Sequence, residues 1–469
     1  DYIQVKQRDS SIHATEREGG SAGVSKDFTV SAQETTFTSR NLPAIRQDEP
    51  YCWCPEDYKV QVSFDLQGTQ FTPNEYKPYS QKWEDVDNQL LKPENTQFGK
   101  YLSFTNPFRP ETKQAYNSEM SFEEKIICAF QILKKKMAWN GRYQLYSKEL
   151  EKVIPKGNGS NADLNFILIS ILKDFGLEAY PVVLSRRSSG MLPYNFPSLQ
   201  KLNTFIVAVY DINKQKYVFL DGSMDVPALN ILPLELSVNK ARILSPKEKE
   251  EKKWVNVMAL ADNKSFMKIE ARLEGNQVKG HRSTILYGQE AVEYQANEKH
   301  KQDSIVSNPE SNASLKNKLT VTNLKVKKQE NDRALIEEEF DFVLQTDRTD
   351  DHLYINPMLF PHLKSNPFIQ TERVLPIEFP YPYKFTMLAT LTLPEGYEVE
   401  ETPQPQVIRT QGDGLQCKYM IQRQGNTISL NYIFYLKEPI FLTEQYKQLQ
   451  ELWTKVIEKN NEILVLKKI

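Results

Sequence analysis

The sequence predicts an α+β fold in which a central domain, a buried helix packed on an antiparallel sheet, lies between all-β domains. The first observation is one helix-length segment, residues 164–175, that is apolar on nearly every side and therefore belongs inside a domain. The second is composition, because 23 Tyr, 23 Phe and 26 Pro suit β-rich structure around that helix. The third is length, since 469 residues correspond to about three domains.

Signals at both ends define the central helix. Ser160 is placed to cap its N-terminus through the side-chain hydroxyl, and Asp163 suits the positive end of the helix dipole. Gly176 is placed to supply the left-handed residue that ends the helix. Residues 177–184 then read as a strand, so we expect the helix to lead directly into a sheet.

Other segments supply the remaining elements of the central region. Ser121 and Glu124 predict the capping box of an earlier helix, which ends near Trp139. After the central helix, residues 202–210 and 217–221 predict a β-hairpin with a polar turn. Closer to the N-terminus, residues 58–66 alternate between apolar and polar, which predicts a half-buried strand.

The order of these elements resembles the core of the transglutaminase-like domains, which belong to the papain-like superfold. The shared features are a Gly-rich turn before the helix, an Asp in its first turn, the buried helix itself, a strand and a hairpin. The resemblance implies a triad: a Cys at the helix N-terminus as nucleophile, a His on a following strand as its base, and an Asp on the next strand that orients the His. The helix dipole suits a thiolate because it lowers the thiol pKa.

The chain departs from this pattern at two of the three triad positions. Aligned on Asp163, the Cys position is Asn161 and the His position is Thr204, whereas the Asp position keeps Asp221. An amide cannot become a thiolate, and a hydroxyl is no base near neutral pH. Losing both groups is expected to lower the rate by on the order of 10⁴-fold or more. We therefore expect a degenerate triad and no enzyme, and we expect neither a cofactor nor a metal site.

A cleft between helix and sheet is expected to persist without the triad. We expect it to be lined by Trp139, Ser160, Asn161, Arg186, Tyr194, Thr204 and Asp221. Three uses of it stay open. It could hold a peptide or glycan in a binding or scaffold protein; Ser160 could serve a hydrolase or acyltransferase as an altered nucleophile, although its ordinary role is the helix cap; or the loop at residues 186–197 could plug the cleft.

Two of these residues also have structural alternatives. Asp221 could cap the turn at Gly222 or pair with Arg186 instead of binding a ligand. Trp139 could pack in the interior instead of lining the cleft.

The resemblance extends over nearly the whole chain to a group of bacterial cell-envelope proteins. It includes the segment N-L-P-A-I-R-Q-D-E-P-Y-C-W-C-P and the Pro- and aromatic-rich belt from Asn356 to Pro382. It implies four regions: 1–67 as the C-terminal part of an N-terminal β-domain, 68–117 as a linker packing on the core, 118–246 as the transglutaminase-like domain, and 247–469 as a C-terminal β-sandwich-like domain with a terminal helix and strand. It also implies a periplasmic or outer-membrane-associated location and a protein, peptide or glycan partner there.

Composition excludes several other classes. A net charge of -2, from 59 basic and 61 acidic residues, gives no electrostatic case for nucleic acid as a partner. No stretch approaches the roughly 20 apolar residues of a transmembrane segment. Four cysteines do not make a disulfide framework, and the five histidines leave residues 118–246 without an imidazole. The central domain therefore has no local base.

Overall fold

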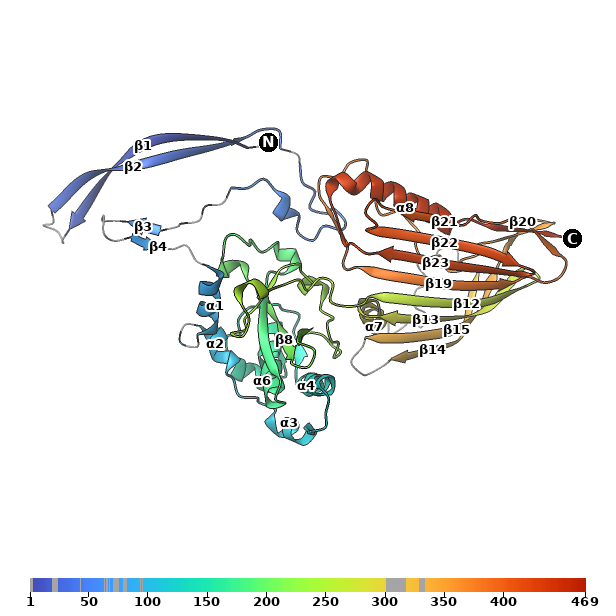
Figure 1. Cartoon of the computed structure of the whole chain (residues 1–469), viewed down its shortest axis with the longest axis horizontal. Helices are drawn as coiled ribbons and strands as arrows, with labels where there is room; N and C mark the ends of the chain where they lie inside the picture. The colour runs from blue at the N-terminus through green and yellow to red at the C-terminus, as the bar shows by residue number, and fades with distance from the viewer. Residues whose placement is uncertain are drawn as a thin grey trace.

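The structure, a computed structural model, shows a mixed α+β fold that is rich in strands (Figure 1). Eight α-helices occur among the residues that it describes. These residues are 3–18, 24–42, 44–62, 64, 66, 68–70, 76–78, 82–92, 94, 96–300, 318–328 and 334–469.

The N-terminal part is extended. β1 (Ile3–Glu18) and β2 (Val24–Ser39) pair antiparallel along their full length in a ribbon that projects from the body of the molecule (Figure 1). The strand predicted at residues 58–66 is wrong for the described part of that segment, because residues 59–62, 64 and 66 form no strand. Alternation specifies two faces but supplies no partner strand, and Phe64 consequently stays 82% exposed. Further on, β3 (Gly68–Gln70) pairs with β4 (Tyr76–Pro78).

Helices then build the outside of the central region. The capping box predicted at Ser121 and Glu124 is confirmed. Ser121 Oγ accepts the Glu124 N–H at 3.2 Å, and Glu124 Oε2 accepts the Ser121 N–H at 2.7 Å. The five helices are α1 (Trp83–Leu91), α2 (Gln97–Leu102), α3 (Arg109–Ala115), α4 (Phe122–Lys136) and α5 (Leu150–Val153).

The central helix has the limits that its sequence predicts. α6 (Asn161–Asp174) follows Ser160, whose Oγ accepts the Asp163 N–H at 3.3 Å, while Asp163 Oδ2 accepts the Ser160 N–H at 2.8 Å. Gly176 adopts φ +76°, the left-handed conformation expected after the helix. Every residue from Asn161 to Leu172 is buried, so the helix lies inside the central region as predicted.

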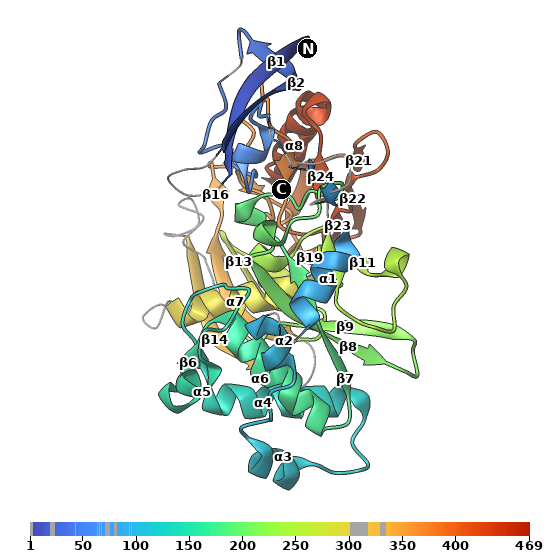
Figure 2. The ribbon, with the colours of Figure 1, turned by 90° about the vertical axis from the view of Figure 1, so that its left-hand side faces the viewer.

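α6 packs on one face of a five-stranded antiparallel sheet, seen in Figure 2. On this face the rings of Phe98, Phe166 and Phe205 lie within 5.1 Å of one another, centroid to centroid. A second apolar cluster covers the opposite face, so the sheet is buried on both sides. The strand order is β11 (Trp254–Val255), β10 (Ala241–Ile243), β7 (Glu178–Leu184), β8 (Thr204–Asp211) and β9 (Lys216–Leu220).

A buried arginine attaches α1 to this sheet. Arg242 is fully buried and binds Asp87 with two hydrogen bonds of 2.6 and 2.7 Å and Glu250 with two of 2.7 and 2.8 Å. Trp83 and Trp254 cover its guanidinium at 5.8 and 5.1 Å. Charged partners on both sides and aromatic rings around it allow the charge to stay inside.

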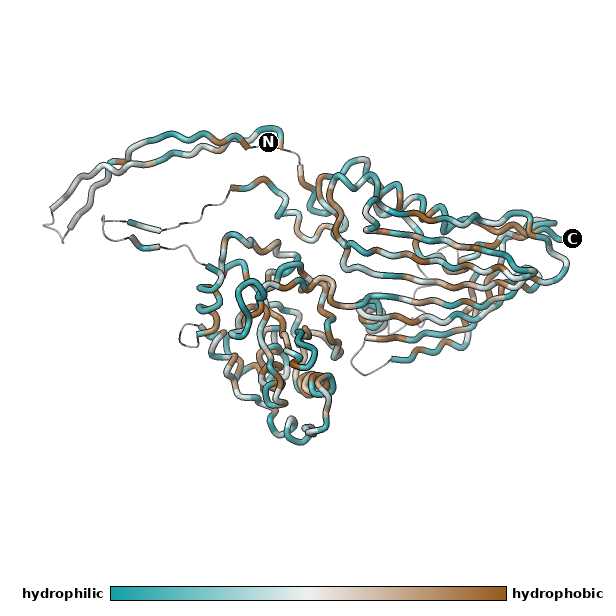
Figure 3. The backbone as a smooth tube through the Cα atoms, in the orientation of Figure 1, coloured by the Kyte–Doolittle hydropathy of each residue, from teal (hydrophilic) through white to brown (hydrophobic). Residues whose placement is uncertain are grey.

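The C-terminal half is built on a mixed eight-stranded sheet whose middle pair, β12 and β19, is parallel. Apolar and polar residues alternate along its strands (Figure 3), as one face packs in a core. The order is β14 (Leu319–Lys328), β15 (Leu335–Gln345), β13 (Gln277–Tyr287), β12 (Lys264–Glu274), β19 (Tyr383–Thr392), β23 (Thr427–Leu436), β22 (Leu415–Gln424) and β21 (Gln406–Arg409).

Smaller elements complete the fold. The helix α8 (Tyr446–Asn460) covers the core face of the large sheet, and α7 (Gln289–His300) follows β13. A four-stranded sheet contains β16 (Asp347–Arg348), β17 (His352–Ile355), β25 (Leu464–Lys468) and β20 (Tyr397–Glu401). Two further pairs are β5 (Ala138–Trp139) with β6 (Asn158–Gly159), and β18 (Ile377–Glu378) with β24 (Ile440–Phe441). Among the described residues, no helix has the length and apolarity to cross a membrane.

Candidate functional site

The first residue of α6, Asn161, joins the helix to the sheet through its side chain. Its Nδ2 donates to Thr204 Oγ1 at 2.6 Å and to the Phe205 carbonyl at 3.2 Å. Its Oδ1 accepts the Gln144 N–H at 2.8 Å. Both polar atoms of the amide therefore have partners inside the protein.

Asp221, directly after β9, ends a second set of bonds. Its Oδ2 accepts from Asn165 Nδ2 at 2.8 Å, and its Oδ1 accepts the Ser223 N–H at 2.9 Å and the Ser223 hydroxyl. Burial raises the pKa of Asp221, and the hydrogen bonds from Asn165 and Ser223 oppose that rise. Of the two structural roles predicted for Asp221, capping its own turn is confirmed by the bond to the Ser223 N–H.

These two sets form one network. The Phe205 carbonyl accepts from Asn165 at 2.8 Å as well as from Asn161. The three predicted triad positions thus converge, with Asn165 as a fourth member that sequence reasoning missed. Its position four residues after Asn161, one turn on along the same helix face, was the available signal.

Burial limits what this network can do chemically. The exposed fractions are 0% for Asn161, Asn165 and Thr204 and 1% for Asp221. The group offers amides, hydroxyls and one carboxylate, and none of these side chains meets solvent. The hydrogen bonds of this network attach α6 to β8 and to the residue after β9.

Ser160 is occupied as a cap. Its Oγ donates to Asp163 Oδ2 at 2.8 Å and accepts the Asp163 N–H at 3.3 Å, and the side chain is buried. The bond from the Asp163 N–H and the 2.8 Å bond from the Ser160 N–H to Asp163 Oδ2 make up the capping box.

Three further side chains lie next to the start of α6. The Arg142 carbonyl accepts both the Asn161 N–H at 3.0 Å and Trp139 Nε1 at 3.1 Å, which places the half-buried Trp139 beside the helix. The Tyr143 ring lies 5.0 Å from Trp139 and 5.7 Å from the Arg186 guanidinium. Burial and the nearby Asp221 charge raise the pKa of Tyr143, a residue that sequence reasoning missed and for which the sequence carries no signal.

Tyr194 lies elsewhere. Its carbonyl accepts from Trp83 Nε1 at 2.8 Å, and its ring lies 5.2 Å from that of Trp254 on the edge strand β11, which is three strands away from β8 in the sheet. The loop that carries it is partly exposed: Met191, Tyr194 and Phe196 are at least half exposed, whereas Arg187 and Leu192 are buried. This exposure does not favour the self-plugging alternative.

The described imidazoles contact residues outside this network. His281 Nδ1 lies 2.9 Å from Asp341, His352 Nε2 lies 2.9 Å from Glu400, and His362 stacks on Phe385 at 4.0 Å. All four cysteines are free thiols, and burial raises the pKa of Cys128 on α4. In the described part of the chain, no group of three or more His, Cys, Asp or Glu is arranged to hold a metal ion.

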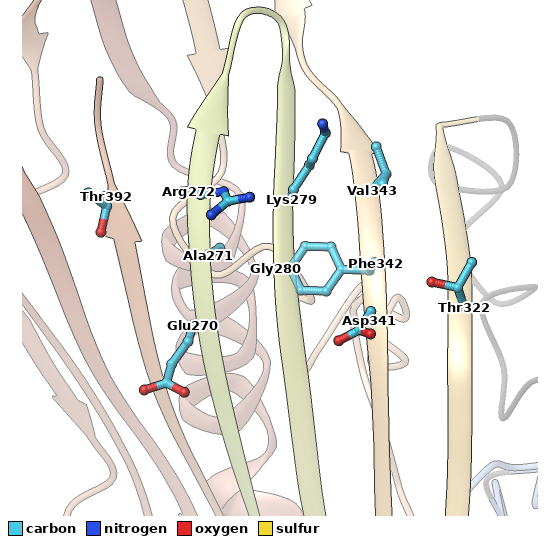
Figure 4. A pocket seen from close by; sticks show the side chains of 10 residues that line it. All are labelled: Glu270, Ala271, Arg272, Lys279, Gly280, Thr322, Asp341, Phe342, Val343 and Thr392. Carbon is cyan, nitrogen blue, oxygen red and sulfur yellow. The ribbon is translucent and has the colours of Figure 1, made fainter. Parts of the chain in front are cut away.

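A separate hollow of about 480 Å³ lies on the large sheet (Figure 4). Its charged side chains are already paired with neighbours: Glu270 with Lys268 at 2.8 Å, and Lys279 with Glu274 at 2.7 Å. It is a solvated surface between strands, lined by Glu270, Ala271, Arg272, Lys279, Gly280, Thr322, Asp341, Phe342, Val343 and Thr392.

Comparisons with known proteins give a family match over part of the chain and similarity to solved structures. Residues 351–466, which run from β17 into β25, match a family described as a domain of unknown function with a solved structure (DUF3858). A crystal structure of a proposed protease from Parabacteroides distasonis is similar at 12% identity and a TM-score of 0.49, over 99% of this chain and 70% of that chain. A comparison with curated proteins found no match.

Proposed function

We propose that this chain is a non-catalytic scaffold protein of the bacterial cell envelope, built around a transglutaminase-like domain. In this proposal the positions of the former triad hold helix and sheet together. The observation that carries it is the 2.6 Å hydrogen bond from Asn161 Nδ2 to Thr204 Oγ1, formed where such a domain would have a thiol and an imidazole. Both side chains are fully buried.

The order of the elements supports the transglutaminase-like assignment. α6 begins at Asn161, β8 begins at Thr204, and Asp221 directly follows β9. The three positions therefore come from a helix start and two adjacent strands, as a nucleophile, base and orienting acid would. Residues 118–246 form this domain in our proposal, with β11 completing its sheet, and the rest of residues 247–469 forms the β-sandwich-like domain.

The chemistry of the network supports a scaffold over a catalyst. An amide at the helix start offers no nucleophile, and the Thr204 hydroxyl cannot serve as a base near neutral pH. We infer that the protein acts by presenting its β-rich parts to a protein, peptide or glycan partner in the periplasm or at the outer membrane. Recovery of the protein in the envelope fraction of disrupted cells would support this location, and recovery in the cytosol would contradict it.

The alternative is a hydrolase or acyltransferase that uses Ser160. The observation in its favour is the 2.8 Å hydrogen bond from Ser160 Oγ to Asp163 Oδ2, which joins a hydroxyl to a carboxylate. The same oxygen also accepts the Ser160 N–H at 2.8 Å, and Ser160 is 1% exposed. The bond from the Ser160 N–H belongs to the capping box, so the same carboxylate oxygen has a structural role without catalysis.

A covalent labelling experiment distinguishes the two proposals. The folded full chain is treated with a serine-directed fluorophosphonate and assayed for turnover of amide substrates, beside Ser160→Ala and the exposed-site control Ser188→Ala. We expect no turnover and no labelling that depends on Ser160. Labelling that is lost in Ser160→Ala but kept in Ser188→Ala would overturn the non-catalytic proposal.

A further inference from the structure

Three segments that are distant in sequence meet at one junction on the molecule. Glu378 on β18 accepts the Tyr58 hydroxyl at 2.8 Å and the Trp53 N–H at 3.3 Å. Asp57 Oδ2 accepts the Met191 N–H at 2.7 Å. The N-terminal segment at residues 49–58 is thus held between the loop after β7 and the C-terminal half.

Arg187 closes this junction from the side of the central region. Its guanidinium lies 4.1 Å from the Trp53 ring and donates to the Pro380 carbonyl at 2.9 Å and the Phe379 carbonyl at 3.3 Å. The side chain is buried. Since it contacts both of the other segments, the walls of the junction are fixed relative to one another.

A pocket of about 200 Å³ lies between these segments. This volume is below the several hundred Å³ of a site for a drug-sized ligand, so it suits one side-chain-sized group. Most of its wall is apolar or aromatic. The apolar part of the wall includes Trp53, Leu192, Val238, Met258, Pro376 and Ile440.

The charged groups that face the interior of the pocket already have partners. Both oxygens of Glu378 accept hydrogen bonds, Asp57 accepts one, and Arg187 donates to two carbonyls. An occupant that buried a polar group there would find few free partners for it. The buried part of an occupant is therefore apolar.

The rim has the opposite character. Lys240 is exposed, lies over the Tyr194 ring at 5.1 Å, and has no carboxylate partner in the described part of the chain. Its neighbour Asn239 is exposed and offers an amide donor and acceptor. Beside them Met191 and Leu442 are 57% and 59% exposed, which extends the apolar surface outward. A cation next to an apolar opening fits an anion attached directly to an apolar group.

We propose that this pocket binds the C-terminal residue of a peptide, with an apolar side chain inside and the α-carboxylate at Lys240. The residue before it lies over Met191 and Leu442, and its backbone pairs with the Asn239 amide. A peptide supplies this backbone, whereas a fatty acid supplies only the apolar group and the carboxylate. The proposal concerns a site separate from the start of α6 and does not depend on the scaffold function.

The test is a calorimetric titration of the full chain, with intrinsic tryptophan fluorescence as a second readout. The probes are N-acetyl-Gly-Leu with a free carboxylate, its C-terminal amide, and hexanoate. We expect the free acid to bind, the amide to bind about fivefold more weakly because it loses one exposed ion pair, and hexanoate to bind more weakly than the peptide.

Variants locate the site. Lys240→Gln is expected to weaken binding of the acid about fivefold and to leave binding of the amide unchanged, whereas Lys249→Gln, an exposed lysine outside the pocket, changes neither. Leu442→Glu is expected to weaken both peptides, with an unchanged melting temperature as the folding control. Equal affinity for acid and amide, tighter binding of hexanoate, no effect of Lys240→Gln, or no binding at all would each overturn the proposal.

Discussion

Asn165 connects the Asp221 carboxylate to the backbone of the next residue, Gly222. Its Nδ2 donates to Asp221 Oδ2 at 2.8 Å, and its Oδ1 accepts the Gly222 N–H at 2.7 Å. One amide on α6 therefore satisfies a hydrogen-bond donor and an acceptor at the end of β9, where both are buried.

Replacing that amide should destabilise the fold. Asn165→Ala leaves the Gly222 N–H and one Asp221 oxygen without partners and removes one of the two donors to the Phe205 carbonyl. We expect the free energy of unfolding to fall by roughly 3 kcal/mol. Urea unfolding measures the change. Asn213→Ala, in the exposed turn between β8 and β9, is the control and should stay within about 0.5 kcal/mol of the parent. Equal stability of the two variants would contradict the role of the network.

Replacing Arg242 should lower the stability of the fold, and a second substitution at Asp87 should restore much of it. Arg242→Met removes two of the hydrogen bonds to the buried Asp87 and leaves it with Lys253, whose Nζ donates to Asp87 Oδ2 at 2.9 Å. We expect a loss of roughly 3 kcal/mol in unfolding free energy. The double variant Arg242→Met with Asp87→Leu should recover much of this loss, because the buried carboxylate is gone and Lys253 keeps Glu250 as a charged neighbour at 3.9 Å. Hydrogen exchange should show faster opening of α1 in the single variant than in the double one. A double variant as unstable as the single one would argue against this explanation.

A close approach of strands restricts position 280. A Cβ on Gly280 would lie 2.6 Å from the Glu270 carbonyl oxygen and 2.8 Å from Phe342 Cζ. Gly280→Ala must push the strands apart, and we expect it to cost about 1–3 kcal/mol. The matched control is Gly414→Ala, whose Cβ would meet the flexible Glu438 side chain at 3.3 Å. Thermal unfolding of both variants gives the comparison, and a larger loss at position 414 would refute it.

His362 should make the free energy of unfolding depend on pH. Its ring stacks on Phe385, and its Nδ1 is buried with no hydrogen-bond partner in the part of the structure described. Burial lowers the pKa of His362 to about 3. The unfolded chain, with a pKa of about 6.5, binds this proton first, so the free energy of unfolding falls by up to about 1.4 kcal/mol per pH unit between pH 6.5 and 3. Above this window the residue has no such effect.

Urea unfolding between pH 7 and pH 4 tests this dependence. His362→Phe should have a shallower decline in stability than the parent, because the proton acceptor is gone. Asn213→Ala, in the exposed turn between β8 and β9, removes no titratable group and should keep the parental slope. Parallel slopes for the parent and His362→Phe would count against the assignment.

Local chemistry made part of the fold predictable. The limits of α6 follow from Ser160, Asp163 and Gly176, because caps act between residues a few positions apart. The strand predicted at residues 58–66 is absent from the described part of that segment, since a strand needs a partner and the alternating pattern names none. Arg242 gave no signal at all, because its partner Asp87 lies far away in the sequence.

The residues of the candidate site were also predictable only in part. Asn161, Thr204 and Asp221 were found through resemblance to a fold in which three positions converge, and their full burial was not visible in the residues. Asn165 was missed because its use depends on which carbonyl of β8 faces α6. Tyr194 was expected beside Asn161, and it lies against Trp254 because the path of its loop is set by long-range contacts.

The parallel pairing of β12 with β19 constrains the order in which the chain folds. Hairpins such as β12–β13 and β22–β23 join neighbouring segments and can close early. The seam between the two halves of the sheet is the β12–β19 pair. It forms only after the long segment between these two strands has been brought back, at a larger cost in loop entropy. We expect the two halves of the large sheet to gain protection from hydrogen exchange first and the seam last during refolding.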